Sequence, residues 1–230
     1  MAYARLCLWL RLSEFSDKYN LPTDLSLSVF LWVNMKIYLI NINDVTEKEL
    51  NHWFDCMSDS RKEEVRNIKN KSKYVSKIIS DHICRKSVSE FCGIPENKIV
   101  FSKNEYGKPF ANGTNANFSV SHSGELVICA VSENEIGIDI EKKREIRPDI
   151  SKKFATDSEN EYIGNDTDRL FEIWTLKEAY FKCTGTGLGA DIKTVSFKKT
   201  GNNFVCSEKG YSITELDLPD GYTGFVCSKE

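Results

Sequence analysis

Alternation of apolar and polar positions predicts strands in two separate parts of the chain. Residues 35–40 read Met-Lys-Ile-Tyr-Leu-Ile and alternate like a first strand. Three further strands are predicted at residues 117–121, 126–131 and 136–141, joined by connections short enough for an antiparallel meander. From residue 195 onward the chain returns to alternating strands with turns at glycine and proline.

Two helical stretches separate these strands. The first spans about residues 46–91, and Thr46 precedes Glu49 by three positions, which is the pattern of a capping box. The second spans residues 149–183. A strand-helix-strand order therefore occurs twice, which predicts an α+β fold of two similar halves, although no internal sequence repeat proves it.

The first 34 residues differ from the rest of the chain. They contain two apolar blocks and only six charges, whereas a secretory signal has basic residues first, one apolar block and a small-residue cleavage site. Either they form an additional element or the core begins at Met35, and we favour the second. We predict an atypical extension at 1–34 that is not part of the folded core, an N-terminal half at 35–135 and a C-terminal half at 136–230.

Composition narrows the function classes. Of the 230 residues, 40% are hydrophobic and 28% charged, as in a globular protein, and no apolar run approaches the 20 or so residues that cross a bilayer. The net charge of −3 argues against a protein that coats nucleic acid. Residues 61–86 nevertheless hold nine Lys or Arg against three Asp or Glu, which fits either a solvated helix face or an anionic ligand. Eight cysteines without C-x-x-C spacing predict reduced thiols.

Two acidic residues lie on one face of the strand predicted at 136–141. Side chains alternate along a strand, so its three isoleucines share one face while Asp139 and Glu141 share the other. Two carboxylates roughly 6–7 Å apart are unfavourable unless they are solvated, paired or bridged by a cation. The pattern is compatible with a solvent-exposed strand face and with a metal site.

A third carboxylate lies on an apolar helix face. In the helix predicted over residues 170–182, Glu178 projects between Trp174 and Phe171 and lies one turn from Lys182. A carboxylate on such a face is costly unless a cation or a metal compensates it. An ion pair between Glu178 and Lys182 and a metal site are both open on this evidence.

These segments together resemble the Sfp-type 4'-phosphopantetheinyl transferases. The hallmark motifs of that family, Gly-x-Asp-x-Glu and Trp-x-x-Lys-Glu-x-x-x-Lys, match residues 137–141 and 174–182. The resemblance covers the chain from about Met35 to its end. Three further segments match in order: Glu-Tyr-Gly-Lys-Pro at 105–109, Phe-Ser-Val-Ser-His-Ser-Gly at 118–124, and Phe154 with Glu159.

The resemblance implies a reaction and an architecture. Coenzyme A would donate its 4'-phosphopantetheine arm to a serine of an acyl or peptidyl carrier protein, leaving adenosine 3',5'-bisphosphate. The fold would be two similar α+β halves related by a pseudo-two-fold, with the active site in the cleft between them. Mg²⁺ or Mn²⁺ would be held by Asp139, Glu141 and Glu178, because an all-oxygen set suits these ions. Glu178, directly or through a metal-bound water, would be the base, and Lys182 would stabilise the leaving phosphate.

The resemblance also implies a coenzyme A pocket. Arg61 and His122 would lie near the 3'-phosphate. Two positions depart from the family pattern: Glu64 stands where a cation is common, and Ser76 stands where an arginine is common, with Lys77 as a nearby substitute. The residues expected to line the pocket are Arg61, Tyr106, Gly107, Lys108, Ser121 and His122.

Further expectations concern partners and alternatives. We expect a monomeric, cytoplasmic enzyme of secondary metabolite biosynthesis, with neither nucleic acid nor membrane as a partner. One alternative is a non-catalytic protein that binds anions or nucleic acid through residues 61–86, but it does not explain why Glu178 would face two strand carboxylates. Another is a degenerate family member that binds without catalysis, against which the intact carboxylates argue. The carrier itself, from a peptide synthetase, a polyketide synthase or fatty-acid synthesis, is open.

Overall fold

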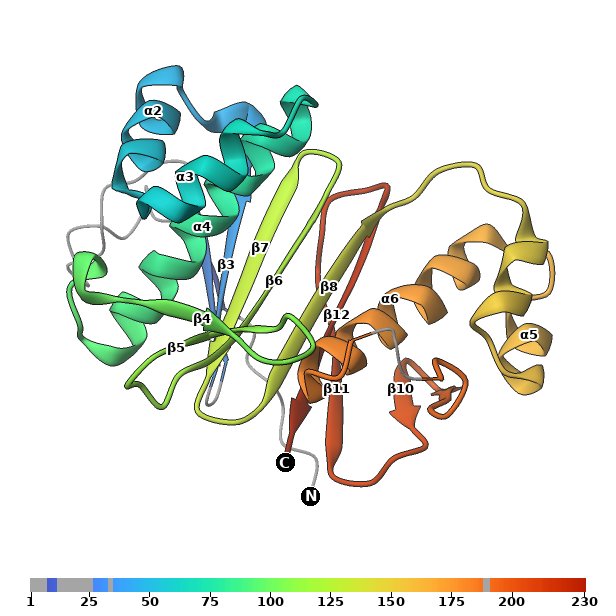
Figure 1. Cartoon of the computed structure of the whole chain (residues 1–230). Helices are drawn as coiled ribbons and strands as arrows, with labels where there is room; N and C mark the ends of the chain where they lie inside the picture. Colours follow the sequence, from blue (N-terminus) through green and yellow to red (C-terminus); the bar gives the residue numbers. More distant parts are fainter. Residues whose placement is uncertain (1–7, 12–26, 33–34, 188–190) are drawn as a thin grey trace.

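The computed structural model of the chain describes residues 8–11, 27–32, 35–187 and 191–230. These residues form two halves side by side, each with a long helix packed on an antiparallel sheet (Figure 1). The predicted α+β fold with two similar halves is confirmed. None of the helices in the described ranges has the length and hydropathy of a bilayer-spanning segment.

The N-terminal half is built on a five-stranded sheet with antiparallel neighbours in the order β1–β2–β3–β7–β6. Helix α4 packs on β3, β6 and β7, and its buried apolar residues, such as Ile79 and Ile83, form a core with them. The strands are β1 (Leu8–Arg11), β2 (Leu27–Trp32), β3 (Met35–Asn41), β6 (Asn117–Ser123) and β7 (Leu126–Ser132).

The single helix predicted over residues 46–91 is interrupted twice. Each of the three helices begins after a residue whose side chain accepts a hydrogen bond from a backbone N–H three positions on, and the predicted capping box of Thr46 and Glu49 is confirmed. The interior caps are Ser58 and Asn70. The helices are α2 (Glu47–Cys56), α3 (Asp59–Arg66) and α4 (Lys71–Cys92).

Short elements complete the N-terminal half. Strands β4 (Phe101–Lys103) and β5 (Pro109–Ala111) form an antiparallel hairpin, joined by residues 104–108. Two 3₁₀ helices, η2 (Ile42–Asp44) and η3 (Glu96–Lys98), precede α2 and β4. The hairpin lies across the ends of the central strands, close to the C-terminal half (Figure 1).

The C-terminal half has a three-stranded sheet in the order β11–β12–β8, against which α6 packs. Helix α6 is capped at its C-terminal end by Gly185, whose φ of 71° is left-handed. The elements are β8 (Ile136–Lys142), η4 (Pro148–Lys153), α5 (Asp157–Ile163), α6 (Thr167–Thr184), β9 (Phe197–Thr200), β10 (Asn203–Cys206), β11 (Tyr211–Glu215) and β12 (Tyr222–Lys229).

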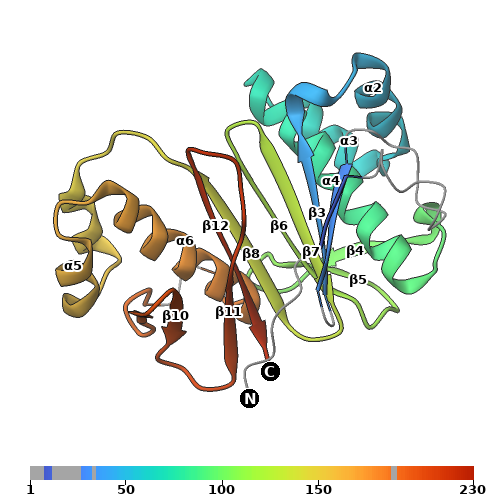
Figure 2. The ribbon, with the colours of Figure 1, turned by 180° about the vertical axis from the view of Figure 1, so that it is seen from behind.

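The predicted antiparallel meander is wrong for its third strand. Strands β6 and β7 do pair antiparallel, but the other edge of β7 is taken by β3, so β8 cannot join there. Strand β8 instead runs beside β6 in the same direction and pairs with β12 on its far edge. The two halves therefore meet along β6 and β8, as both views of the ribbon show (Figures 1 and 2).

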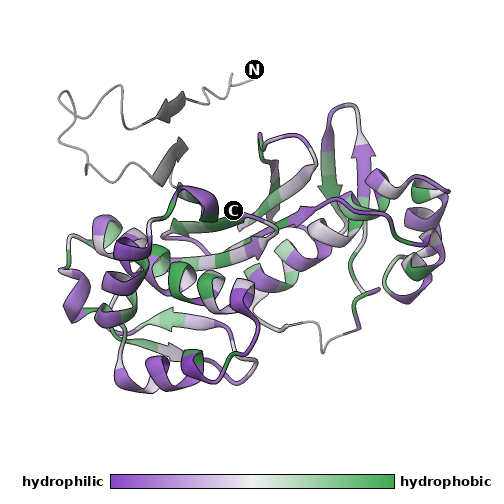
Figure 3. Cartoon of the chain, turned by 90° about the horizontal axis from the view of Figure 1, so that it is seen from above, coloured by the Kyte–Doolittle hydropathy of each residue, from purple (hydrophilic) through white to green (hydrophobic). Residues whose placement is uncertain are grey.

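Two strands from the N-terminal extension join the sheet edge. Strand β2 pairs antiparallel with β3, and β1 pairs with β2. The rest of residues 1–34 lies outside the described residues, so only for those residues does the predicted separation from the folded core stay a prediction. Elsewhere the packing is conventional, with hydrophilic helix surfaces outward and hydrophobic residues toward the sheets (Figure 3).

Candidate active site

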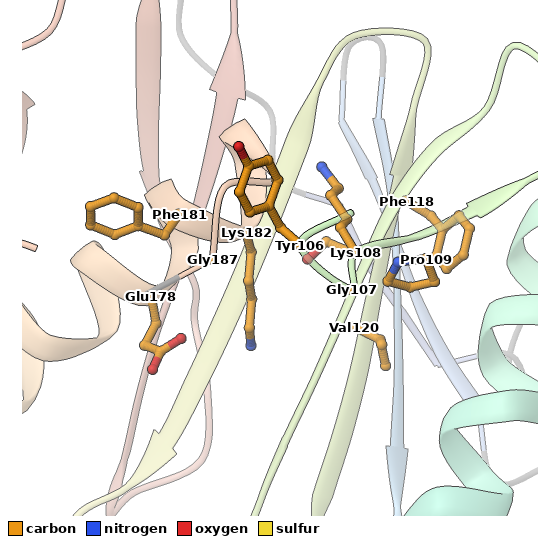
Figure 4. Close-up of a pocket in the computed structure, with 12 residues that line it drawn as sticks. Tyr106, Gly107, Lys108, Pro109, Phe118, Val120, Glu178, Phe181, Lys182 and Gly187 are labelled. Carbon is orange, nitrogen blue, oxygen red and sulfur yellow. The ribbon is translucent and has the colours of Figure 1, made fainter. Parts of the chain in front are cut away.

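A cavity of about 960 Å³ opens between the two halves, within the range of about 300–1,000 Å³ usual for small-molecule sites. Tyr106 and Lys108 line a smaller adjoining cavity of about 240 Å³, into which Glu178 and Lys182 also extend from α6 (Figure 4). The structure thus brings the predicted site residues into two connected spaces. The residues in the larger one are Arg61, Gly107, Ser121, His122, Asp139, Glu141, Glu178 and Lys182.

Asp139 is the most enclosed acid of the site, with 4% of its surface exposed. Its Oδ1 accepts hydrogen bonds from Ser121 Oγ at 2.7 Å and from Lys182 Nζ at 2.6 Å. Its Oδ2 is buried and has no hydrogen-bond partner in the described part of the chain. A buried carboxylate oxygen without a donor is costly, so this atom is available to a cation that enters the cavity.

Glu141 is held from both halves. Its Oε2 accepts a hydrogen bond from Ser123 Oγ on β6 at 2.9 Å, and its Oε1 accepts one from Trp174 Nε1 on α6 at 3.2 Å. Arg144 adds a longer contact, 3.7 Å from Oε2. Trp174, from the second hallmark motif, therefore helps to fix the side-chain orientation of Glu141, from the first.

Gly137 explains how α6 reaches these carboxylates. A Cβ atom at this position would lie 2.0 Å from the carbonyl oxygen of Ala179 and 2.2 Å from the backbone nitrogen of Cys183. The helix backbone therefore rests directly on β8, which only glycine permits. This contact brings Glu178 and Lys182 beside Asp139.

We expect Gly137→Ala to lower the stability by roughly 1–3 kcal/mol, since the clash involves backbone atoms that cannot rotate away. Thermal or denaturant unfolding measures the loss. Gly201→Ala is the control, because its Cβ would meet nothing within 4 Å and only its φ of 61° is unfavourable. A Gly137→Ala protein as stable as the parent would contradict the close approach of α6.

Glu178 is half-buried and has the most altered acidity of the predicted site residues. Burial, together with the negative charges of Asp139 and Glu141, raises its pKa to about 7, against the opposing effect of Lys182. The Lys182 ammonium binds Asp139 rather than Glu178, so among the described contacts the i,i+4 ion pair is not observed. Glu178 is thus a carboxylate poised to exchange a proton near neutral pH.

The three carboxylates supply the right donor type for a divalent ion but not a finished ligand shell. In the described ranges, no three acidic, histidine or cysteine side chains are close enough together to hold a metal as they stand. Two features still favour a cation here: the unpartnered Oδ2 of Asp139, and the burial of Glu178 beside the negative charges of Asp139 and Glu141, which raises its pKa.

The wall contributed by α3, α4 and β4 is cationic. Arg61 pairs with Glu64, the departure from the family pattern, and lies 3.7 Å from Asp81. Burial and the charges of Arg61 and Lys103 lower the pKa of Lys77. Lys103 was missed by the sequence reasoning, because nothing in the pattern of a short strand distinguishes a cavity-facing lysine from a solvated one.

His122 and Lys108 differ in what they can offer a ligand. Partial burial and the ammonium groups of Lys77 and Lys182 lower the pKa of His122, which places it in the cationic part of the cavity. Lys108 Nζ donates to the backbone carbonyls of Ile136 at 3.2 Å and Cys183 at 2.9 Å. Its ammonium therefore ties the β4–β5 loop to the start of β8 and the end of α6.

Lys177, the first lysine of the second motif, points away from the cavity. It is fully buried, pairs with Glu159 at 3.0 Å and donates to the carbonyl of Val195 at 2.6 Å. Glu159 also accepts from the backbone N–H of Thr156, as the second partner of a capping box. This network fixes α6 against α5 and the chain leading into β9, so Lys177 has a structural role.

Comparisons with known proteins agree with this geometry. A model of the 4'-phosphopantetheinyl transferase superfamily matches residues 135–220, and a model described as 4'-phosphopantetheinyl transferase, N-terminal, matches residues 44–134. The chain is 34% identical to the 4'-phosphopantetheinyl transferase gsp of Aneurinibacillus migulanus, over 77% of this chain and 80% of the relative. It is 31% identical to the 4'-phosphopantetheinyl transferase Sfp of Bacillus subtilis, over 84% and 92%.

The similarity extends to a relative that matches a shorter part of the chain. A human L-aminoadipate-semialdehyde dehydrogenase-phosphopantetheinyl transferase is 34% identical over 49% of this chain and 43% of its own length. The two long bacterial matches span both halves and therefore include the cavity between them. This chain belongs to the Sfp-type 4'-phosphopantetheinyl transferases.

Proposed function

We propose that this enzyme transfers the 4'-phosphopantetheine arm of coenzyme A to a serine of a carrier protein, using Mg²⁺ or Mn²⁺ held by Asp139, Glu141 and Glu178. The observation that carries the proposal is the convergence of these three acids from β8 and α6 on one cavity, with a buried carboxylate oxygen left unpaired. A divalent ion bound there would neutralise charge on the pyrophosphate of coenzyme A.

Glu178 is the proposed base. It would accept the proton of the carrier serine hydroxyl as the serine oxygen forms its bond to phosphorus and the bond to the adenosine 3',5'-bisphosphate leaving group breaks. Its pKa of about 7 in the metal-free protein leaves Glu178 about half ionised at neutral pH, and a divalent ion bound beside it would raise the ionised fraction that can accept the proton. Lys182, fixed against Asp139, would stabilise the negative charge of the departing phosphate.

The cationic wall is proposed to bind the adenosine end of coenzyme A. Arg61, Lys77 and Lys103 line the cavity, and His122 lines it as well. Because Glu64 takes part of the charge of Arg61, Lys77 and Lys103 are the cations best placed to meet the 3'-phosphate. Lys77 would then take the role expected from the sequence.

The same placement weighs against the alternative of a nucleic-acid-binding surface. Arg61 and Lys77, from the basic stretch at 61–86, turn into a cavity of small-molecule size. A nucleic acid would need an exposed, continuous basic face. We therefore propose a monomeric, cytoplasmic enzyme whose partners are coenzyme A and a carrier protein, with neither nucleic acid nor membrane.

Mass measurement tests the proposed reaction. The protein is incubated with coenzyme A, Mg²⁺ and apo carrier proteins from a peptide synthetase, a polyketide synthase and fatty-acid synthesis. We expect at least one carrier to gain a single phosphopantetheine, and the gain to disappear when a chelator removes the divalent ion. Unmodified carriers in every reaction, or full transfer in the presence of chelator, would contradict the proposal.

A further inference from the structure

Three serines on β6 join the two halves of the molecule through their side chains. One edge of β8 forms a backbone ladder with β12, but its other edge faces β6 without such a ladder. There, alternate backbone N–H groups of β8 donate to serine hydroxyl oxygens of β6. The pairs are Ile138 with Ser119 at 3.1 Å, Ile140 with Ser121 at 3.4 Å and Lys142 with Ser123 at 3.0 Å.

This arrangement fixes the direction of each hydroxyl. A buried backbone N–H needs an acceptor, and each serine supplies one without a main-chain contact between the strands. A hydroxyl has one hydrogen to donate, and its oxygen here is already engaged by the amide. The hydrogen is then free for an acceptor on the same side of β8.

Two of the three serines direct that hydrogen to a carboxylate. Ser121 donates to Asp139 Oδ1 at 2.7 Å, and Ser123 donates to Glu141 Oε2 at 2.9 Å. Ser119 differs, because in the part of the chain that the structure describes its hydroxyl contacts no carboxylate. Ser119 and Ser123 therefore make the same contact with β8, and only Ser123 touches an acid of the site.

We propose that Ser123 is a positioning residue for the divalent ion, acting through Glu141. This inference rests on the proposed metal site. One carboxylate oxygen of Glu141 accepts from Ser123 on β6 and the other accepts from Trp174 on α6. The orientation of the Glu141 side chain therefore depends on how the two halves pack together. Removing the Ser123 hydroxyl leaves the indole contact and the longer contact of Arg144, and the carboxylate gains freedom to rotate away from Asp139.

The test is the affinity for Mn²⁺ alone, measured by electron paramagnetic resonance or calorimetry without coenzyme A or carrier. We expect Ser123→Ala to weaken binding roughly tenfold, as for other residues that orient metal ligands. Ser119→Ala is the matched control: it should lower the melting temperature by a similar amount and leave the Mn²⁺ affinity within about twofold, since it removes only the amide contact. Ser123→Thr, which keeps the hydroxyl, should restore the affinity.

The outcomes separate this inference from the function on which it rests. If the parent protein binds Mn²⁺ and Ser123→Ala binds it equally well, the positioning role is overturned while the metal site stands. If Ser119→Ala weakens Mn²⁺ binding as much as Ser123→Ala, the serine contacts between β6 and β8 affect Mn²⁺ binding only through the stability of the protein. The proposal is then also overturned. If the parent protein binds no Mn²⁺, the proposed metal site itself fails.

Discussion

Replacing Glu178 with glutamine is expected to reduce transfer by roughly 10²–10⁴-fold, the usual contribution of a positioned general base, and at the same time to stabilise the metal-free protein at pH 8. The activity falls because a neutral amide can neither accept the serine proton nor bind a cation strongly. The stability rises because the folded protein no longer buries an ionised carboxylate beside the negative charges of Asp139 and Glu141. Carrier mass measurements and thermal unfolding test the two effects.

The raised pKa of Glu178 predicts how the stability of the folded protein changes with pH. The folded-state pKa of about 7 lies above the ordinary value of 4.5, so the folded protein holds the proton of Glu178 more tightly than the unfolded chain. Stability therefore declines as the pH rises from about 4.5 to 7, and the full penalty is present above pH 7. After allowance for solvent screening, the penalty is about 2 kcal/mol. The Glu178→Gln variant should lack this decline.

Glu172→Gln on the same helix is the control for stability. Its carboxylate accepts from Lys199 Nζ at 3.0 Å, so removing its charge should leave stability unchanged or slightly lower. A Glu178→Gln protein that is less stable than the parent at pH 8 would show that Glu178 is not a strained, like-charged neighbour of Asp139. Full activity in that variant would exclude it as the base.

The second large effect concerns Asp139. We expect Asp139→Asn to lower kcat/KM by roughly 10³-fold, because several kcal/mol of charge stabilisation would depend on the proposed divalent ion. The substitution removes the charge that fixes Lys182, so two proposed catalytic groups are disturbed together. Steady-state kinetics with varied Mg²⁺ measures the loss, and raising the Mg²⁺ concentration should recover only part of it.

Glu125→Gln provides the matched change of charge. Glu125 is a partly exposed acid that pairs with Lys142 at 2.7 Å, and its replacement also adds one positive unit to the net charge. We expect its kcat/KM to stay within about twofold of the parent, as for most surface substitutions. Equal losses in the two variants would point to a general electrostatic effect rather than to a metal site.

Much of the site could be predicted from the sequence because its residues belong to regular elements. Alternation along β8 placed Asp139 and Glu141 on one face, and helical spacing along α6 placed Glu178 on a face with aromatic residues. The three isoleucines opposite the strand carboxylates are buried, as alternation requires. Periodicity within one element therefore determined which side chains could act together.

The remaining features depend on contacts between elements, which periodicity cannot reveal. Lys182 was expected to pair with Glu178 or to be free for the reaction, yet it binds Asp139, 43 positions away. Strand β8 does not pair with β7, because that edge of β7 is already occupied by β3. Strand β3 lies almost 100 residues before β8 in the chain, so no local pattern reveals this. The burial of Lys177 with Glu159 likewise depends on how α5 packs on α6.

Titration with Mn²⁺ tests most directly whether acids from β8 and α6 share one divalent ion. The parent protein and Glu178→Gln are compared at pH 8, with the number of ions bound per chain read from the free Mn²⁺ signal. The convergence of Glu178 on Asp139 and Glu141 predicts one ion per chain in the parent and at least tenfold weaker binding in the variant. Equal stoichiometry and equal affinity in both proteins would contradict it.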